Sequence, residues 1–246
     1  MFNQDKRPLI LLTGCIDPMG MTFTKVQNPD VRRLQYIDAI KFYLKTTDNI
    51  IVFVENSGVD ISGEFEEYKD RLEILTFSGN NYDKALGKGY GEMQILRYAF
   101  ENSGFIKQNS SVCKITGRYK ILNIKRILRS YEASDCNVMV DLPRRLQYAD
   151  SRIFIADKFF FLKYLFNYKD LINDSKGVYF EHVLNKAVLQ SIIEDCSYLP
   201  LKYMPRIMGQ SGTDNFNYDH SFSNWFPDNI RKMISFKLFT EGLKNQ

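Results

Sequence analysis

Residues 114–119, Lys-Ile-Thr-Gly-Arg-Tyr, pass from an apolar segment into a small polar residue, a glycine and an arginine. This order is typical of a buried strand that brings backbone amides and a cation to the edge of a sheet. A second stretch, residues 88–92, Lys-Gly-Tyr-Gly-Glu, places two glycines around an aromatic residue where a helical pattern begins. The unpaired amides and the dipole of a helix start favour an anion. Together the two stretches predict a phosphate-binding site.

The composition indicates an ordinary globular protein. The chain has 246 residues, of which 44% are hydrophobic and 25% charged, so we expect a single α/β domain over residues 1–246. Its 33 basic and 29 acidic residues are too balanced for a dedicated nucleic-acid-binding protein, whereas an anionic small ligand or membrane surface fits. Four widely spaced cysteines, none in a C-x-x-C pair, argue against a zinc ribbon or a disulfide framework.

The cysteine spacing and the absence of a membrane-targeting pattern predict a cytoplasmic location, with the thiols reduced. The first seven residues carry no apolar signal core, and no apolar segment reaches the length of a membrane-spanning helix.

Buried strands alternate with amphipathic helices through the first part of the chain. Strands are expected at residues 8–13, 50–54, 72–77, 112–116, 137–140 and 152–156, and helices at residues 28–45, 88–102, 120–130, 159–166 and 179–194. This alternation predicts an α/β fold with a Rossmann-like, doubly wound, mainly parallel sheet, helices on both faces and a helical C-terminal part.

Right-handed crossovers place the first strand centrally, between the second and the fourth. In such a sheet the ligand binds beyond the carboxyl ends of the strands, where the strand order reverses. The residues expected at this edge are Thr13, Gly14, Glu55, Asn56, Thr116, Gly117, Arg118 and Tyr119.

The residue types at this edge suit a nucleotide. Glu55 or Asn56 can hydrogen-bond to a base and a ribose, and Lys88 and Arg118 can hold a diphosphate through charge-assisted bonds. The amides near Gly89 and Gly91 add further donors. The alternative for residues 114–119 is a strand end with a capping arginine on a solvated face.

A third polar loop, residues 205–213, contains Arg206, Ser211 and Thr213, which could close over a diphosphate. A surface turn explains the same composition. Likewise, Asp150, Ser151 and Arg152 suit either sugar recognition or a turn before a strand.

The order of these motifs resembles the nucleotide-binding half of GT-A-type glycosyltransferases, in particular those of bacterial O-antigen and capsule biosynthesis. Residues 88–103 look like the helix before the central strand of that fold, and residues 114–119 stand where its acidic motif occurs. The resemblance covers residues 8–215. It implies a nucleotide-binding half at 8–141 and an acceptor and catalytic half at 142–215, followed by a C-terminal segment at 216–246.

One departure from that family concerns the metal. The family's central strand normally ends in Asp-x-Asp, which holds a divalent cation, and no such motif occurs at residues 114–119. We therefore expect Arg118 and Lys88 to neutralise the diphosphate, with Asp141 as the remaining candidate metal ligand.

Residues 178–182, Val-Tyr-Phe-Glu-His, look like the acidic motif that supplies a catalytic carboxylate in GT-A enzymes. The resemblance implies that Glu181, assisted by His182, acts as the general base for an acceptor hydroxyl. The alternative is that Glu181 only stabilises the dipole at a helix start.

The C-terminal residues 225–243 mix aromatic and aliphatic side chains with Arg231, Lys232 and Lys237. This pattern fits an amphipathic helix on an anionic membrane surface, and equally a terminal helix docked on the domain.

The sequence thus predicts a glycosyltransferase that moves a sugar from a nucleotide-diphosphate sugar to a saccharide or lipid-linked acceptor in surface polysaccharide biosynthesis. A nucleotidyltransferase is the first alternative, but it is weakened because the glycine-rich, Arg- and Lys-containing loop expected after the first strand is represented in residues 14–25 only by Gly14, Gly20 and Lys25. A non-catalytic module that binds a nucleotide or a membrane is the second. In each case the ligand is a nucleotide or an anionic surface, and not a nucleic acid.

Overall fold

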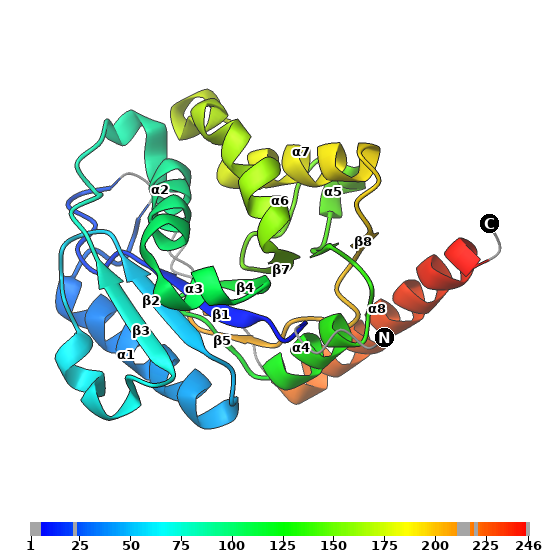
Figure 1. Cartoon of the computed structure of the whole chain (residues 1–246), viewed down its shortest axis with the longest axis horizontal. Coiled ribbons are helices and arrows are strands. Elements are labelled where there is room, and N and C mark those ends of the chain that lie inside the picture. Colours follow the sequence, from blue (N-terminus) through cyan, green and yellow to red (C-terminus); the bar gives the residue numbers. More distant parts are fainter. Residues whose placement is uncertain (1–5, 22–23, 211–216, 219–220, 245–246) are drawn as a thin grey trace.

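A computed structural model describes residues 6–21, 24–210, 217–218 and 221–244. Its centre is a seven-stranded sheet with the order β3-β2-β1-β4-β7-β6-β8 (Figure 1). The strands are β1 (Leu9–Gly14), β2 (Ile51–Glu55), β3 (Leu72–Thr76), β4 (Ser111–Thr116), β6 (Val138–Met139), β7 (Ile153–Asp157) and β8 (Tyr198–Leu199).

Four strands, β3, β2, β1 and β4, run parallel, with β1 between β2 and β4 as predicted. All residues of β1 and β2 are buried, which is why these strands read as continuous apolar runs. The prediction of a mainly parallel α/β sheet is confirmed.

The sheet departs from a simple doubly wound order beyond β4. The expected strand at residues 137–140 is β6, but it does not follow β4 in space, because β7 lies between them and runs antiparallel to both. Five residues of β7 pair with β4, while β6 contributes only two pairs to the ladder. The longer pairing, buried along residues 153–156, therefore decides which strand neighbours β4.

Helices cover both faces of the sheet (Figure 1). The α-helices are α1 (Pro29–Thr46), α2 (Gly87–Asn102), α3 (Gly104–Gln108), α4 (Ile124–Glu132), α5 (Pro143–Leu146), α6 (Lys158–Lys163), α7 (Phe180–Ile193) and α8 (Phe222–Lys244). Short 3₁₀ segments are η1 (Ser62–Tyr68), η2 (Lys84–Leu86), η3 (Leu165–Leu171) and η4 (Asp174–Lys176). One core forms where α1 and α4 pack on the sheet, and a second forms under α2, α6 and α7. These two cores confirm the prediction of helices on both faces.

The helix expected at residues 120–130 begins later than predicted, at Ile124. The preceding residues form β5 (Lys120–Ile121), which pairs antiparallel with β9 (Ile207–Met208) in a small second sheet. The Ile121 amide also donates to the Tyr43 hydroxyl at 3.1 Å. These contacts with distant parts of the chain override the local helical pattern.

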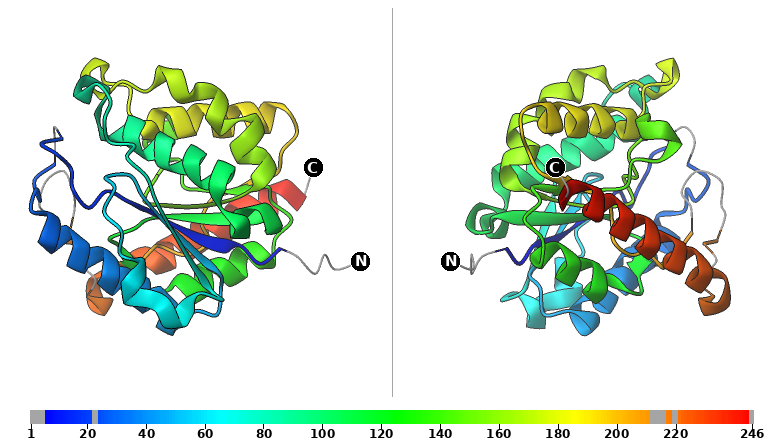
Figure 2. Two further views of the ribbon diagram at one scale, coloured as in Figure 1. Left: turned by 60° about the vertical axis from the view of Figure 1, so that its left-hand side comes forward. Right: turned by 90° about the vertical axis from the view of Figure 1, so that its right-hand side faces the viewer.

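The C-terminal helix α8 runs diagonally across the outside of the molecule (Figure 2). Its buried side holds Trp225, whose indole Nε1 donates to the Met204 carbonyl at 2.8 Å, and an ion pair joins Lys232 to Asp141. The helix is therefore docked, which was one of the two expectations for this segment. No helix within the described ranges has both the length and the apolar character that crossing a bilayer requires.

Candidate functional site

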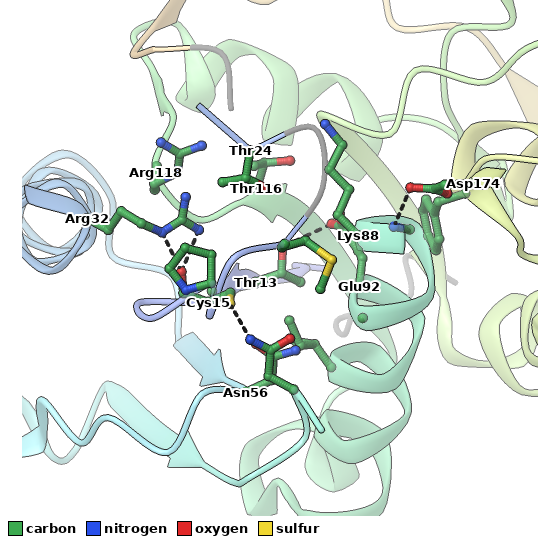
Figure 3. Close-up of a pocket in the computed structure, with 18 of the residues that line it drawn as sticks. Thr13, Cys15, Thr24, Arg32, Asn56, Lys88, Glu92, Thr116, Arg118 and Asp174 are labelled. Carbon is green, nitrogen blue, oxygen red and sulfur yellow. Dashed lines mark hydrogen bonds between the residues drawn. The ribbon is translucent and has the colours of Figure 1, made fainter. Parts of the chain in front are cut away.

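A cavity of about 160 Å³ lies at the carboxyl ends of β1, β2 and β4 (Figure 3). The strand order reverses between β1 and β4, so this is the position where an open α/β sheet binds its ligand. The starts of α2 and α7 close the opposite side. The cavity walls include nine of the residues that the sequence predicted for the site: Thr13, Gly14, Asn56, Lys88, Gly89, Gly91, Thr116, Arg118 and Glu181.

Glu55 does not reach this cavity, which corrects its predicted contact with a base or a ribose. Its carboxylate is fully buried and accepts hydrogen bonds from the amides of Ile16, Ser57 and Val59 at 2.7, 2.9 and 3.1 Å. Three backbone donors saturate much of a carboxylate's acceptor capacity. Glu55 thus orders the loops after β1 and β2, and Asn56 is left facing the cavity.

Gly117 and Tyr119 also lie outside the cavity lining. The Gly117 amide donates to the Thr13 carbonyl at 2.9 Å, and a Cβ at this position would lie 2.5 Å from that oxygen. Only glycine permits so close an approach of two backbones. The Tyr119 side chain is buried, and its ring packs edge-on against Tyr218. Both residues shape the end of β4 and do not offer ligand-binding atoms to this cavity.

His182 and Arg206 are placed away from the cavity. The His182 Nδ1 atom accepts the Tyr179 amide at 3.1 Å and so caps the start of α7. The Arg206 guanidinium lies over the rings of Phe222 and Trp225, at 5.6 and 5.9 Å from their centroids. Ser211 and Thr213 lie outside the described residues.

The glycines at the start of α2 make room for a side chain of the protein itself. Gly87 has a φ of +79°, and a Cβ on it would lie 2.1 Å from the Asp174 Oδ2 atom. A Cβ on Gly89 would lie 3.0 Å from both Asp174 Oδ1 and the Phe180 amide nitrogen. The Gly89 amide donates to the Asp174 carboxylate at 3.4 Å. The amides at this helix start therefore face a carboxylate of the protein itself, and a ligand phosphate at this position stays a prediction.

The Asp174 carboxylate lies in an unfavourable environment for a charged group. It is 6% exposed, its Oδ1 atom has no hydrogen-bond partner in the described part of the chain, and burial raises its pKa above the ordinary value. An incoming cation or hydrogen-bond donor would relieve both conditions.

Two buried arginines face the other side of the cavity. Arg32 donates through Nε to the Cys15 carbonyl at 2.7 Å, and Arg118 donates through Nη1 to the Gln35 side-chain oxygen at 2.9 Å. Among the described residues, every hydrogen-bond partner of these two guanidinium groups is neutral. They are 5% and 7% exposed. This side of the cavity therefore carries two buried positive charges (Figure 3).

Sequence reasoning missed Arg32, although a signal was present. Arg32, Tyr36 and Ile40 follow one another at helical spacing, and all three are buried on α1. An arginine within an apolar stripe must find polar partners inside the fold, because its charge is costly to bury alone. Such a residue, on the first helix after the central strand, is a candidate for the ligand site.

An ion pair beneath the cavity connects residues 114–119 with residues 88–92. The Lys114 ammonium is fully buried, forms an ion pair with Glu92, and donates to the Ser151 carbonyl at 2.7 Å. Glu92 lines the cavity and accepts the Thr13 hydroxyl at 3.1 Å. The Ser151 hydroxyl in turn donates to the Glu181 carboxylate at 2.8 Å. One buried cation thus positions Glu92 directly and Glu181 through Ser151.

The residues at the end of β4 do not fit a divalent metal of the GT-A type. Lys114 and Arg118 place cations where carboxylate ligands would be needed, and the Glu92 carboxylate is committed to Lys114. Asp141 pairs with Lys232 and accepts the Leu201 amide at 3.0 Å. Across the described ranges, no group of three or more His, Cys, Asp or Glu side chains is placed to hold a metal ion.

Asn56 supplies a hydrogen-bond acceptor to the cavity. Its side chain is 2% exposed, lines the cavity, and has an Oδ1 atom that accepts no hydrogen bond within the described structure. A buried amide oxygen without a partner costs free energy, so a ligand N–H or O–H donor placed here would be favourable.

Comparison with known proteins gave structural matches alone: no family model matches the chain, and no curated protein matches its sequence. A protein designated a nucleotide-diphospho-sugar transferase from Desulfovibrio desulfuricans G20 is 13% identical, with a TM-score of 0.45 over 80% of each chain. The inositol-1-phosphate CTP transferase from T. maritima is 12% identical, with a TM-score of 0.44 over 82% of this chain and 86% of that one. Core-mannan synthase A from Aspergillus fumigatus, in a Mn/GDP form, is 8% identical, with a TM-score of 0.39 over 88% and 82%. At these values the likeness does not specify a substrate or a reaction.

Proposed function

We propose that this protein is a glycosyltransferase that uses a nucleotide-diphosphate sugar as donor. The observation that carries the proposal is the pair of buried guanidinium groups, Arg32 and Arg118, which face one cavity and bond to neutral groups among the described residues. Buried cations need counter-charge, and a diphosphate supplies two negative groups with oxygens spaced for guanidinium donors.

The remaining cavity residues suit the other parts of such a donor. Asn56 offers an amide oxygen, which has no hydrogen-bond partner within the described ranges, to an N–H group of a base or to a ribose hydroxyl. Thr13, Gly14 and Thr116 are small and leave room for the ligand at the strand ends. In this arrangement Arg118, Arg32 and Lys88 stabilise the negative charge that develops on the departing diphosphate, which is the main electrostatic requirement of the transfer.

We assign the general base to Glu181. It lines the cavity, is half-buried, and is oriented by the Ser151 hydroxyl at 2.8 Å. A carboxylate held in place by a neighbouring donor can accept the proton of an acceptor hydroxyl as that oxygen attacks the sugar. His182 does not share this role, because its Nδ1 atom already accepts the Tyr179 amide.

The proposal predicts donor-specific stabilisation of the protein. One class of nucleotide-diphosphate sugar should raise the melting temperature, because a ligand at about 100 times its Kd stabilises the folded state by about 2.7 kcal/mol. Because the β4 edge does not fit a metal, the shift should persist in the presence of EDTA. The measurement is a thermal-shift screen of uridine, guanosine and thymidine diphosphate sugars.

Turnover assays then separate the three candidate functions. Release of nucleoside diphosphate with a saccharide acceptor supports a glycosyltransferase. Release of pyrophosphate from a nucleoside triphosphate and a sugar phosphate would instead identify a nucleotidyltransferase. Binding without any turnover would identify a non-catalytic module.

We further propose that the acceptor is lipid-linked, as in surface polysaccharide biosynthesis, and that α8 rests on the inner membrane surface. Ile230, Ile234 and Leu238 follow one another at four-residue intervals on α8 and are 38%, 56% and 65% exposed. Arg231 and Lys237 lie beside them on the helix in exposed ion pairs with Asp228 and Glu241. Exposed pairs of this kind are weak, so both cations can still interact with lipid headgroups. This combination suits an anionic lipid surface.

The membrane proposal predicts that the protein sediments with vesicles that contain anionic phospholipid. Ile234→Asp should weaken this binding about tenfold, because it removes an apolar contact and adds a repelled charge. Ser235→Asp adds the same charge to an exposed neighbouring position and is the matched control. Equal losses in both variants, or a wild-type protein that stays in the supernatant, would argue against insertion of this face.

A further inference from the structure

A second cavity, of about 700 Å³, opens at the same edge of the sheet. Because β7 is antiparallel to β4, and β6 is antiparallel to β7, the carboxyl ends of β4 and β6 and the start of β7 all lie at this edge. The cavity is enclosed by the residues after β6, by the segment after β8, and by α8. Its lining includes Asp141, Asp150, Arg152, Tyr198, Tyr218, Trp225 and Lys232.

The two cavities are separated by the short segment before β7. Asp150 and Arg152 line the second cavity. The Arg152 carbonyl accepts the Thr116 amide at 3.0 Å, and the intervening Ser151 hydroxyl donates to Glu181 at 2.8 Å. Thr116 and Glu181 line the first cavity. The segment of residues 150–152 therefore contributes to the lining of the second cavity and, through Ser151, also contacts the proposed base.

The lining of the second cavity restricts the class of ligand. Arg152 binds Asp150 in a two-bond pair at 2.9 and 2.6 Å, and Lys232 pairs with Asp141, so both lining cations are already neutralised. That arrangement disfavours a phosphate. A purely apolar ligand is equally disfavoured, because it would strip water from four charged groups.

Aromatic side chains add apolar surface to the lining of the second cavity. Tyr198, Tyr218 and Trp225 line the cavity together with the fixed charged pairs. A saccharide matches this surface, because each sugar ring has apolar C–H faces that pack on aromatic rings and hydroxyls that exchange hydrogen bonds with carboxylates and guanidinium groups.

A strained turn forms part of the rim. Arg144, Arg145 and Leu146 have φ angles of 55°, 56° and 63°, a left-handed conformation that is unfavourable for a non-glycine residue. The buried Asn185 side chain holds the turn by donating to the Leu146 carbonyl at 2.9 Å. Strain of this kind persists where the surrounding structure fixes it, and here it presents Leu146 to the cavity.

We infer that the second cavity is the acceptor site and binds a neutral sugar residue of the acceptor. This inference rests on the proposed glycosyltransferase function. The acceptor hydroxyl extends past Ser151 to Glu181, which takes its proton. The hydroxyl oxygen bonds to the anomeric carbon as the bond from that carbon to the diphosphate oxygen breaks, and the nucleoside diphosphate leaves.

The chain contains a built-in reporter for this site. Trp225 is its single tryptophan and lines the second cavity, so intrinsic tryptophan fluorescence of the intact protein monitors that cavity directly. The experiment titrates the protein with methyl and octyl glycosides of glucose, galactose, mannose and N-acetylglucosamine, without any donor. At least one glycoside should produce a saturable change in emission.

Variants locate the binding. Phe239→Ala removes a 40% exposed ring that lines the cavity and packs against Tyr198, so it should weaken glycoside binding about tenfold without unfolding the protein. Tyr198→Ala should have at least the same effect. Arg118→Ala, in the first cavity, should leave glycoside affinity unchanged.

Two results would overturn the inference: no saturable change with any glycoside, or an affinity that Phe239→Ala and Tyr198→Ala leave intact. Because the titration needs neither donor nor turnover, it succeeds or fails separately from the glycosyltransferase assay. If transfer occurs and both variants keep the wild-type KM for the acceptor, the function stands and this site is excluded.

Discussion

Arg118→Ala is expected to lower the kcat/KM of sugar transfer by about two to three orders of magnitude, the usual effect of removing one preorganised donor from a developing negative charge. Arg118 is 7% exposed, lines the cavity and donates to the neutral Gln35 side chain. Within the described ranges no acidic side chain forms an ion pair with Arg118, so we expect its charge to bind a ligand anion. Steady-state kinetics with the donor found in the thermal-shift screen measure the effect.

The fold should tolerate the same substitution. The side chain makes one hydrogen bond within the described structure, to Gln35, so the free energy of unfolding should fall by less than about 3 kcal/mol. Arg118→Lys keeps the charge but loses the planar pair of donors, and should recover only part of the activity. Arg126→Ala, on the exposed side of α4, is the matched control and should keep full activity. Full activity in Arg118→Ala would refute the diphosphate assignment.

Lys114→Met is expected to lower the free energy of unfolding by about 3–5 kcal/mol, the usual cost of removing one partner from a buried ion pair. The Lys114 side chain is 0% exposed and Glu92 is 23% exposed. Without the ammonium, the Glu92 carboxylate and the Ser151 carbonyl both lose a donor inside the protein. Urea denaturation at an unchanged m-value measures the loss.

The double variant Lys114→Met, Glu92→Leu is the control for this prediction. It removes both charges together, so it should recover much of the stability that the single variant loses. A single variant within about 1 kcal/mol of the wild type would show that the pair is not an important part of the fold. Transfer activity should stay low in both variants, because Ser151 and Glu181 lose the ammonium that positions them.

The candidate site illustrates what a motif can and cannot predict. Residues of both stretches, 88–92 and 114–119, line one cavity, while phosphate binding there stays a prediction. Their individual roles differ from the pattern, because Gly89 accommodates Asp174, and Gly117 allows contact with the Thr13 backbone. A glycine in such a motif indicates that another group lies close to its backbone. It does not indicate whether that group belongs to a ligand or to the protein itself.

The sequence by itself determined the parallel part of the sheet, the first helix and the sheet edge at which the first cavity lies. Apolar runs such as residues 9–14 are buried on both faces, and Asn28 caps α1 through local hydrogen bonds, so short segments carry that information. Only the tertiary structure decided that β7 lies between β4 and β6, that Glu55 turns away from the cavity, and that Lys114 meets Glu92. These outcomes depend on the direction of side chains and on partners far apart in the chain, and local periodicity constrains neither.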